Sequence, residues 1–459
     1  MEQRDLVVIG SGPGGHAAAL RAADLGARVA LIEADSPGGN CVSFACLPNA
    51  VMLETVRAGL ELQDLSLSGV MAAGDGLSFS RAVARRNRLV AGLIEGIRNQ
   101  LRALNIELIH GLAHLTSPQT VTVSLSDGGS TELSAAAFVI ATGARPEPPS
   151  LPGYSEEILT MDQALRLPEA PASALALGGG PVGLGFVLEQ AFVLASFGTR
   201  VTVAEPGGEV LPGADEELVS YLMQALEAAG VRVLTNTRVR EVAAEGDSRD
   251  ALLTAPEGDL RVPAGIVMAP DCRRPHFEGL GLEEIGVATA AGRVRVDDRC
   301  ATTVPGIFAV GDVTGELMLS HAAAHQGRVA AENVLGRDAR VRLRAVPRTL
   351  HTQPELAYVG LNEQQARERE HEVRVGLADL GGNLAAVARG RGEGVVKLVA
   401  DGRHGEILGV HALGPGACEL IGQAALAMEL EATVHDLAAV THWHPSLSEA
   451  LVEAARRAI

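Results

Sequence analysis

Two cysteines near the amino terminus have a spacing that suits redox chemistry. Cys41 and Cys46 lie five residues apart, directly after Gly38 and Gly39. In a regular helix their Cα atoms would be roughly 8.6 Å apart, whereas a disulfide requires about 4.4–6.8 Å. A bridge therefore needs a distorted turn, for which the two glycines supply backbone freedom. A bridge closing so short a loop is easily reduced, which favours a redox pair; two free thiols in the core are the alternative.

A histidine and a glutamate near the carboxyl terminus form a candidate base. His444 precedes a proline and lies five residues before Glu449. A carboxylate that accepts a hydrogen bond from an imidazole fixes its tautomer and leaves the other nitrogen as a competent base. Thiolates are the nucleophiles of disulfide exchange, so such a base would control the rate. The alternative is a histidine without a catalytic role, and the neighbouring His442 and Trp443 are expected to pack.

A glycine turn near the amino terminus predicts a dinucleotide site. Residues 10–15 read Gly-x-Gly-x-Gly-Gly between an apolar strand at 6–9 and a helical run at 17–25. In such a turn Gly10 permits the tight bend, Gly12 lets the backbone approach a pyrophosphate, and Gly15 allows close helix–strand packing. The helix start offers free N–H groups. Glu33 ends the next strand, 23 residues after Gly10, where it would bind a ribose hydroxyl.

A second copy of this pattern lies about 168 residues further along the chain. A strand at 174–177 leads into Gly178, Gly180 and Gly183, and a helix runs to about residue 197. Glu205 follows Gly178 by 27 residues, four more than in the first copy, so we expect one additional helical turn near residues 183–187. An acid at this position favours NAD over NADP. The alternative is a nucleotide fold without a working nicotinamide site.

Length and composition bound the class of protein. The 459 residues allow several domains. The two glycine-turn units predict an α/β protein with two Rossmann-like dinucleotide-binding domains, followed by a carboxyl-terminal α+β domain. We place the segments at 1–150 (first nucleotide unit, with the cysteine pair), 151–272 (second nucleotide unit), 273–342 (return to the first unit) and 343–459 (α+β domain). The family resemblance described next implies that the first and third segments bind FAD, that the second binds NAD, and that the last is a dimerisation domain. The net charge of −18 argues against nucleic acid as a partner. No membrane span, secretory signal, disulfide framework or metal site is expected, which indicates a cytoplasmic protein. Lys397 is the only lysine.

Several motifs together resemble one family. Residues 10–15, Gly38-Gly39-x-Cys41-x4-Cys46-x-Pro48, Ala141-Thr142-Gly143 and the run from Thr303 to Asp312 look like the pyridine nucleotide–disulfide oxidoreductases. The resemblance extends from residue 5 to about 454, and residues 394–416 and 442–449 are most similar to members that oxidise a dithiol. It implies one FAD per subunit, a Cys41–Cys46 redox disulfide, and a homodimer in which the partner subunit supplies the His444–Glu449 base.

The resemblance also implies the cofactor-binding residues and a role in cell redox homeostasis. For FAD they are Gly10, Gly12, Gly14, Gly15, Glu33, Gly39, Thr142, Gly143, Gly311, Asp312, Leu319, Ser320, His321 and Ala322. For NAD(H), the expected co-substrate, they are Gly178, Gly180, Gly183, Glu189, Glu205 and Arg273.

One departure from the family pattern concerns the nicotinamide half. After Cys46 the family has a proline, a small polar residue and a lysine, whereas this chain reads Leu47-Pro48-Asn49-Ala50. The glutamate that pairs with that lysine corresponds to Glu189, displaced by the insertion.

Three functions follow from these residues. The first is an FAD-dependent enzyme that oxidises a small dithiol or a lipoyl-carrier protein with NAD. The second is a related flavoprotein that acts on another dithiol or disulfide with altered or absent use of NAD. The third is an FAD-bound interaction subunit with low turnover.

Overall fold

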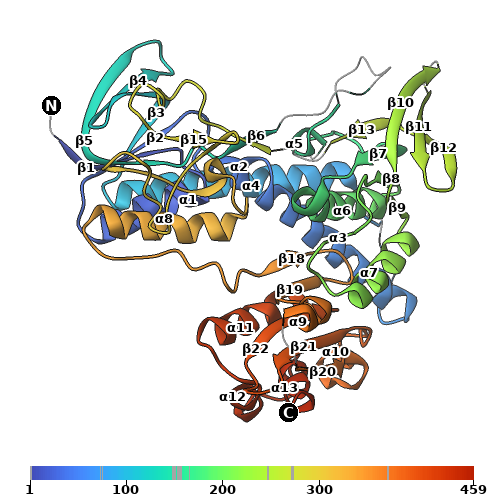
Figure 1. The fold of residues 1–459 in the computed structure, drawn as a ribbon. Coiled ribbons are helices and arrows are strands. Elements are labelled where there is room, and N and C mark those ends of the chain that lie inside the picture. Colours follow the sequence, from blue (N-terminus) through green and yellow to red (C-terminus); the bar gives the residue numbers. More distant parts are fainter. Residues whose placement is uncertain are drawn as a thin grey trace.

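The computed structural model describes residues 3–72, 74, 76–146, 151, 158–164, 166–245, 248–269, 273–369 and 372–459. Two units built on parallel sheets are followed by an antiparallel sheet packed with helices, which confirms the predicted α/β class. Figure 1 shows this last part, in orange and red, below the other two. The segment boundaries predicted at residues 150/151 and 272/273 adjoin stretches that lie outside the described residues. None of the described helices is both long enough and apolar enough to cross a membrane.

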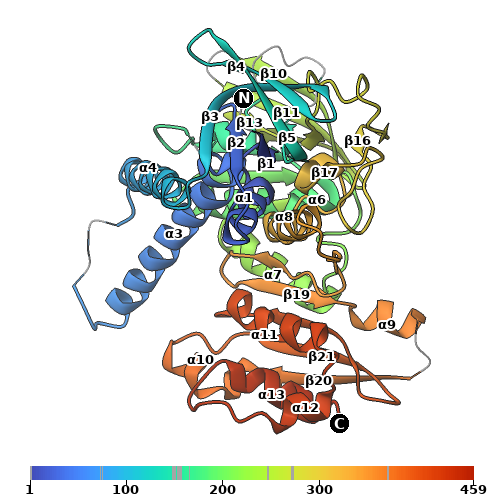
Figure 2. The ribbon, with the colours of Figure 1, turned by 90° about the vertical axis from the view of Figure 1, so that its left-hand side faces the viewer.

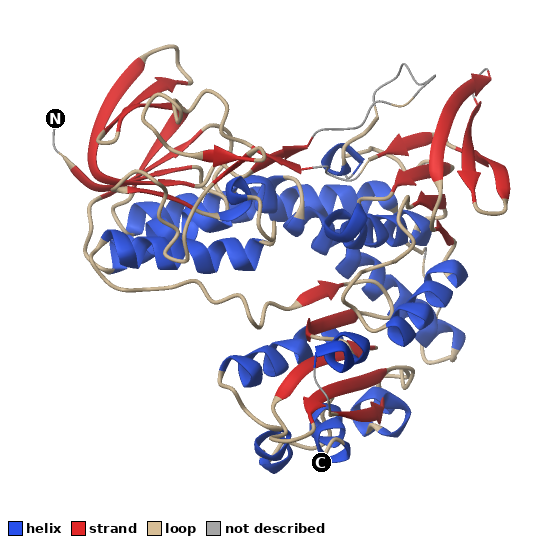
Figure 3. Ribbon diagram, viewed as in Figure 1, coloured by secondary structure: helices blue, strands red, loops and turns tan. Residues whose placement is uncertain are grey.

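The first unit is a parallel sheet with helices on one face (Figure 3). Its strands lie in the order β3 (Glu107–Ser117), β2 (Val29–Glu33), β1 (Arg4–Ile9), β5 (Ser130–Ile140) and β17 (Ile307–Ala309). The strand β4 (Thr120–Leu125) joins β3 to β5 in an antiparallel extension. The residues of β1 from Leu6 to Ile9 are buried, as expected for a central parallel strand covered on both faces.

Two helices pack closely against each other under this sheet. Figures 1 and 2 show α1 (Pro13–Asp24) alongside α8 (Ser320–Val334). A Cβ atom at Gly327 would lie 2.0 Å from the carbonyl oxygen of Gly14, so only a glycine allows this approach. Contact between α1 and α8 brings residues 311–327 to the amino-terminal glycine turn.

The cysteine segment connects the first sheet to a long helical pair. The short helix α2 (Gly39–Ser43) is followed by α3 (Cys46–Leu67) and α4 (Phe79–Ala103). The far end of α3 projects from the body of the molecule in Figure 2. The amino-terminal half of α3 packs against the second nucleotide unit, where the buried residues Met52, Leu53 and Val56 join the core around α6.

The second unit repeats the architecture of the first with fewer strands. Its parallel sheet has the order β13 (Ile266–Met268), β7 (Ser173–Leu177), β8 (Arg200–Ala204) and β9 (Val231–Leu234). The helix α6 (Gly180–Ser196) follows β7 and has 17 residues, whereas α1 has 12. The additional residues expected from the sequence therefore lengthen this helix. The other elements are α5 (Met161–Ala164), α7 (Glu216–Ala228) and the antiparallel strands β10 (Arg238–Glu245), β11 (Ser248–Ala255) and β12 (Gly258–Pro263).

The carboxyl-terminal part is an antiparallel sheet of five strands packed with helices. Their order is β18 (Arg348–Leu350), β19 (Leu356–Gly360), β22 (Ile407–Leu413), β21 (Val395–Asp401) and β20 (Val373–Asp379). The strand β20 lies at an edge of the sheet, and its side chains are mostly not buried. The helices are α9 (Glu363–Arg369), α10 (Leu384–Ala388), α11 (Ala417–Glu429), α12 (Val434–Ala439) and α13 (Ser448–Arg457).

Lys397 joins the carboxyl-terminal part to the second unit. Its ammonium lies 2.8 Å from Asp215, which caps the start of α7, and 2.9 Å from Glu363 at the start of α9. The Lys397 side chain is only 9% exposed. A buried ammonium requires such partners, so the only lysine of the chain holds two domains together.

Candidate active site

The first glycine turn forms a cradle for a nucleotide. A Cβ atom at Gly15 would lie 1.9 Å from the carbonyl oxygen of Gly10, so the helix start packs directly on the turn. A Cβ atom at Gly12 would instead meet no atom within 4 Å, because Gly12 faces a cavity. The helix α1 starts at Pro13 with no side chain capping it. Free N–H groups beside open space fit the pyrophosphate of a dinucleotide.

Glu33 lies at the edge of the same cavity with its carboxylate held by the backbone. Its Oε2 accepts hydrogen bonds from the backbone N–H of Ser11, at 2.8 Å, and from the Ser11 hydroxyl, at 2.5 Å. Its Oε1 accepts from the N–H of Asp35 at 2.8 Å. A carboxylate fixed at the end of β2 can bind a ribose hydroxyl, the role the sequence predicted.

The far wall of the cavity comes from distant parts of the chain. Arg273 Nη1 lies 3.4 Å from Asp312 Oδ2, and both residues face the cavity. We had expected Arg273 among the NAD residues; the structure places it here because β14 (Arg273–Pro275) pairs with β6 (Ala144–Pro146), which continues from the turn at Thr142 and Gly143. The predicted FAD residues that line the cavity are Gly10, Gly12, Gly14, Glu33, Gly39, Thr142, Gly143, Gly311, Asp312 and Ser320.

Four of the predicted FAD residues are not among those that line the cavity: Gly15, Leu319, His321 and Ala322. Gly15 supports the turn from beneath. His321 Nε2 lies 3.0 Å from the carbonyl oxygen of Pro347, so its ring is held by the chain that leads to β18.

The two cysteines face this cavity from either side of a break in the helix. The helix α2 ends at Ser43, and α3 begins at Cys46. Between them Phe44 has φ −134° and Ala45 has φ −121° and ψ −88°, which are not helical angles. The distorted turn required for a bridge between Cys41 and Cys46 is therefore present. Cys41 and Cys46 are free thiols in this structure, and the disulfide between them stays a prediction.

The two thiols differ in acidity. The pKa of Cys46 is lowered to about 6, chiefly by a hydrogen bond from the Cys41 thiol, with help from the Ser320 hydroxyl and the charge of Arg273. The pKa of Cys41 is raised well above its usual value by the same hydrogen bond and by burial. Cys46 is also the first residue of α3, where the helix dipole favours a thiolate. The cysteine pair therefore carries one negative charge, which lies on Cys46.

The hydroxyl of Ser320 is a contact that the sequence did not predict. Its Oγ lies 3.2 Å from Cys46 Sγ, across a separation of 274 residues. We had expected Ser320 only as one of the FAD-binding residues. No spacing in the sequence could have indicated this contact, because α8 reaches the cysteines only through its packing on α1.

The second glycine turn holds its acid in the same way as the first. Glu205 Oε2 accepts from the N–H of Gly180 at 3.2 Å, and Oε1 accepts from that of Gly207 at 2.7 Å. A Cβ atom at Gly178 would lie 2.2 Å from Glu205 Oε2, so the acid lies directly over this glycine. Gly183 follows in the first turn of α6. These residues suit the ribose of a second nucleotide.

Glu189 forms a hydrogen bond with Asn49, whereas the family pattern pairs this glutamate with a lysine. Asn49 Nδ2 donates to Glu189 Oε2 at 2.6 Å, and the backbone N–H of His351 donates to Oε1 at 2.7 Å. Ala50, where the family has lysine, is exposed. Glu189 is thus placed beside the cysteine helix, not at the glycines of the second turn. Asn49 was not among the predicted site residues.

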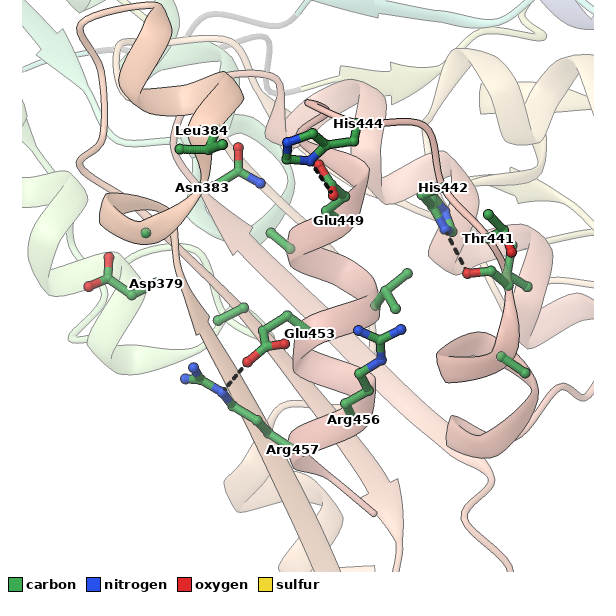
Figure 4. A pocket seen from close by; sticks show the side chains of 16 residues that line it. Asp379, Asn383, Leu384, Thr441, His442, His444, Glu449, Glu453, Arg456 and Arg457 are labelled. Carbon is green, nitrogen blue, oxygen red and sulfur yellow. Dashed lines mark hydrogen bonds and ion pairs between the residues drawn. The ribbon is translucent and has the colours of Figure 1, made fainter.

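His444 and Glu449 form the predicted pair on the carboxyl-terminal part. His444 Nδ1 lies 2.9 Å from Glu449 Oε1, and the N–H of Ser446 donates to Oε2 at 2.8 Å. These two hydrogen bonds lower the pKa of Glu449, so its carboxylate stays ionised. Figure 4 shows the His444 ring beside a hollow that Asn383 and Leu384 also line, with Glu449 on the helix below.

This base lies on an open face of its own domain. Every residue that lines the His444 hollow comes from residues 378–457, and none of them lines the nucleotide cavity. Trp443 is 71% exposed and does not pack within the chain, contrary to our expectation. Leu384, Leu430 and Val440 on this domain are also exposed. Within one chain the base and the two thiols therefore line different cavities.

A dinucleotide cradle with an acidic thiol at its wall, followed by a second nucleotide unit, defines a flavoprotein disulfide oxidoreductase. Residues 4–327 match the family described as pyridine nucleotide-disulphide oxidoreductase, and residues 346–455 match the dimerisation domain of that family. The chain belongs to this family; it is an oxidoreductase that uses FAD and NAD(H), and its dimerisation domain supports a homodimer.

Several relatives are similar over the whole chain. Dihydrolipoyl dehydrogenase from Thermus scotoductus is 37% identical, covering 99% of this chain and 97% of its own. The structure of LpdA from Mycobacterium tuberculosis is 30% identical, with a TM-score of 0.89, and covers 99% of this chain and 100% of its own. The HOCl-induced flavoprotein disulfide reductase RclA from Escherichia coli is 26% identical, with a TM-score of 0.86, and covers 98% and 99% of the two chains.

Proposed function

We propose that the enzyme is a dihydrolipoamide dehydrogenase, which converts dihydrolipoamide and NAD⁺ to lipoamide and NADH. The observation that carries this proposal is the acidic Cys46 thiol beside Cys41 in the nucleotide cavity. The His444–Glu449 pair on the dimerisation domain supports it, as does the 37% identity to a dihydrolipoyl dehydrogenase over the whole chain. The substrate is a small dithiol or the lipoyl group of a separate carrier protein.

The base and the two cysteines divide the thiol chemistry between them. His444 of one subunit takes a proton from the dithiol, and Glu449 stabilises the resulting imidazolium. The substrate thiolate attacks Cys41, which breaks the Cys41–Cys46 bond and leaves Cys46 as thiolate. The second substrate thiolate then displaces Cys41, so the substrate leaves as a disulfide and the cysteine pair has gained two electrons. FAD would be held by the glycine turn at residues 10–15, Glu33 and Asp312, and would supply the two-electron chemistry that connects the cysteine pair to NAD⁺.

A second candidate is a flavoprotein reductase that acts on another disulfide or dithiol. It is favoured by the replacement of the family lysine with Ala50 and by the contact of Glu189 with Asn49. These changes lie next to the cysteines and alter the charge near the expected nicotinamide site. The similarity to the reductase RclA supports this second candidate.

An anaerobic titration tests both candidates. The purified holoenzyme is treated with dihydrolipoamide, and a second sample with NADH, while the flavin spectrum is followed. Reduction by both reagents is expected for a dihydrolipoamide dehydrogenase. Reduction by the dithiol alone would overturn that assignment in favour of the second candidate. No change with either reagent would indicate a low-turnover FAD-bound subunit.

A further inference from the structure

Glu189 is a buried carboxyl group at the point where three parts of the chain meet. It lies on α6 of the second unit and is 7% exposed. Its two hydrogen-bond donors are Asn49 on α3 and the backbone of His351 next to β18. Among the described residues no arginine or lysine forms an ion pair with it. A buried carboxylate with neutral partners only is costly to keep ionised.

The charge on Cys46 acts on this carboxyl group. Cys46 and Asn49 lie three residues apart in the first turn of α3, on the same face of the helix. Burial raises the pKa of Glu189, the two hydrogen bonds lower it and the Cys46 thiolate raises it, so that the resulting pKa is about 7. Cys418 on α11 also faces Glu189, but burial holds its pKa far above neutral, so it stays a thiol. Cys46 is thus the neighbour whose charge changes with the redox state.

Asn49 suits both protonation states of Glu189. Its Nδ2 donates to the carboxylate in the structure, while its Oδ1 is buried and has no hydrogen-bond partner. If the amide turns over, Oδ1 accepts a hydrogen bond from protonated Glu189. The lysine typical of the family is a donor only and would keep the glutamate ionised.

We propose that Glu189 takes up a proton when the Cys41–Cys46 disulfide is reduced, so that the appearance of the Cys46 thiolate leaves the charge of the buried site unchanged. The inference rests on the redox pair of the proposed function. A dithiol that becomes a disulfide gives up two electrons and two protons. The electrons break the Cys41–Cys46 bond, one proton stays on the Cys41 thiol, and the other binds Glu189 instead of leaving for solvent. Glu189 is therefore a positioning residue that acts through Cys46.

Proton release during reduction tests this proposal. Holoenzyme in weak buffer at about pH 7, the pKa of Glu189 beside the Cys46 thiolate, is reduced with one equivalent of dithiothreitol while an indicator dye reports released protons. The wild type is expected to release clearly less than one proton per cysteine pair, and Glu189→Gln close to one. Glutamine retains the hydrogen bonds, since its Oε1 accepts from His351 and its Nε2 donates to Asn49 Oδ1.

The matched control is Glu54→Gln, which removes a carboxylate from α3 that is exposed and paired with Arg57. The pKa of Glu54 is lowered by this arginine, so it stays ionised and its loss should not change proton release. If the wild type and Glu189→Gln released the same number of protons, this inference would be wrong, while the proposed function would still stand. If dithiothreitol does not reduce the cysteines, as judged by thiol titration, both the proposed function and the inference are wrong.

An infrared measurement on the wild type tests the proposal even if Glu189→Gln does not fold. The redox difference spectrum of the wild type should gain the C=O absorption of a protonated carboxyl group on reduction. Glu54→Gln should retain this band, and Glu189→Gln should lose it. Its absence from the wild-type spectrum would also overturn the inference.

Discussion

The Ser320 hydroxyl lies 3.2 Å from the sulfur of Cys46 and stabilises the thiolate form of that cysteine. The two residues come from α8 and α3, and they are brought together at the wall of the nucleotide cavity. A thiolate that receives hydrogen bonds from both Cys41 and Ser320 persists at a pH where an ordinary thiol would be protonated.

Removal of the Ser320 hydroxyl should therefore make Cys46 less acidic. In the two-electron-reduced wild type, we expect the long-wavelength thiolate–flavin absorption to disappear as the pH falls through about 6. In Ser320→Ala the loss should occur at a pH higher by about one unit, because a hydrogen bond to a charged group has been removed. A pH titration of this absorption measures the shift.

Ser43→Ala is the control for this titration. The Ser43 hydroxyl is buried near the same cavity without a hydrogen-bond partner, so its removal should leave the transition unchanged. An identical transition in wild type and Ser320→Ala would show that Ser320 does not stabilise the thiolate.

Mixed dimers should recover activity from two inactive variants. Cys46→Ser lacks the thiolate and His444→Gln lacks the base, so each homodimer should be inactive with dihydrolipoamide. After dissociation and random reassociation in equal amounts, about a quarter of the wild-type rate should return, since half of the dimers are mixed and each contains one complete site. A mixture of Cys46→Ser with Cys41→Ser should stay inactive. No recovery in the first mixture would contradict a site shared between subunits.

Loss of Lys397 should weaken the junction between the second unit and the dimerisation domain. Lys397→Met leaves Asp215 buried and without its ammonium partner, which costs about 3–5 kcal/mol for a broken buried ion pair. The midpoint of thermal unfolding should fall by several degrees. Arg367→Met is the matched control, because Arg367 pairs with the same Glu363 on the surface and contributes at most about 1 kcal/mol. Equal losses in the two variants would contradict the role of Lys397.

Glu189 should make the enzyme less stable as the pH rises. Its pKa in the folded protein is about 7, above the ordinary value of 4.5, so its protonated form stabilises the fold below pH 4.5 and this stabilisation is lost as the pH rises to about 7. The total loss corresponds to about 3 kcal/mol. Compared with Glu189→Gln, the wild type should therefore unfold at progressively lower temperature between pH 5 and pH 8. A constant difference across this range would show that Glu189 is not titrating there.

The local patterns of the sequence were sufficient to predict much of the fold. Each glycine turn, with its strand, helix and acid, lies within about thirty consecutive residues, and the structure has β1, α1 and β2 where the sequence placed them. The edge strand β20 is harder to recognise from the sequence, because its mostly unburied residues carry little hydrophobic pattern. The histidine–glutamate contact was predictable because only a short segment separates the two residues.

Contacts between distant segments were decided by packing alone. The sequence by itself determined the family, the two nucleotide units, the break at the cysteine pair and the His444–Glu449 pair, because each depends on residues close together in the chain. Only the tertiary structure revealed four side-chain contacts between distant residues. They are Ser320 with Cys46, Arg273 with Asp312, Asn49 with Glu189, and Lys397 with Asp215. These pairs are 39 to 274 residues apart, and their geometry follows from how helices and sheets stack, which no local spacing encodes.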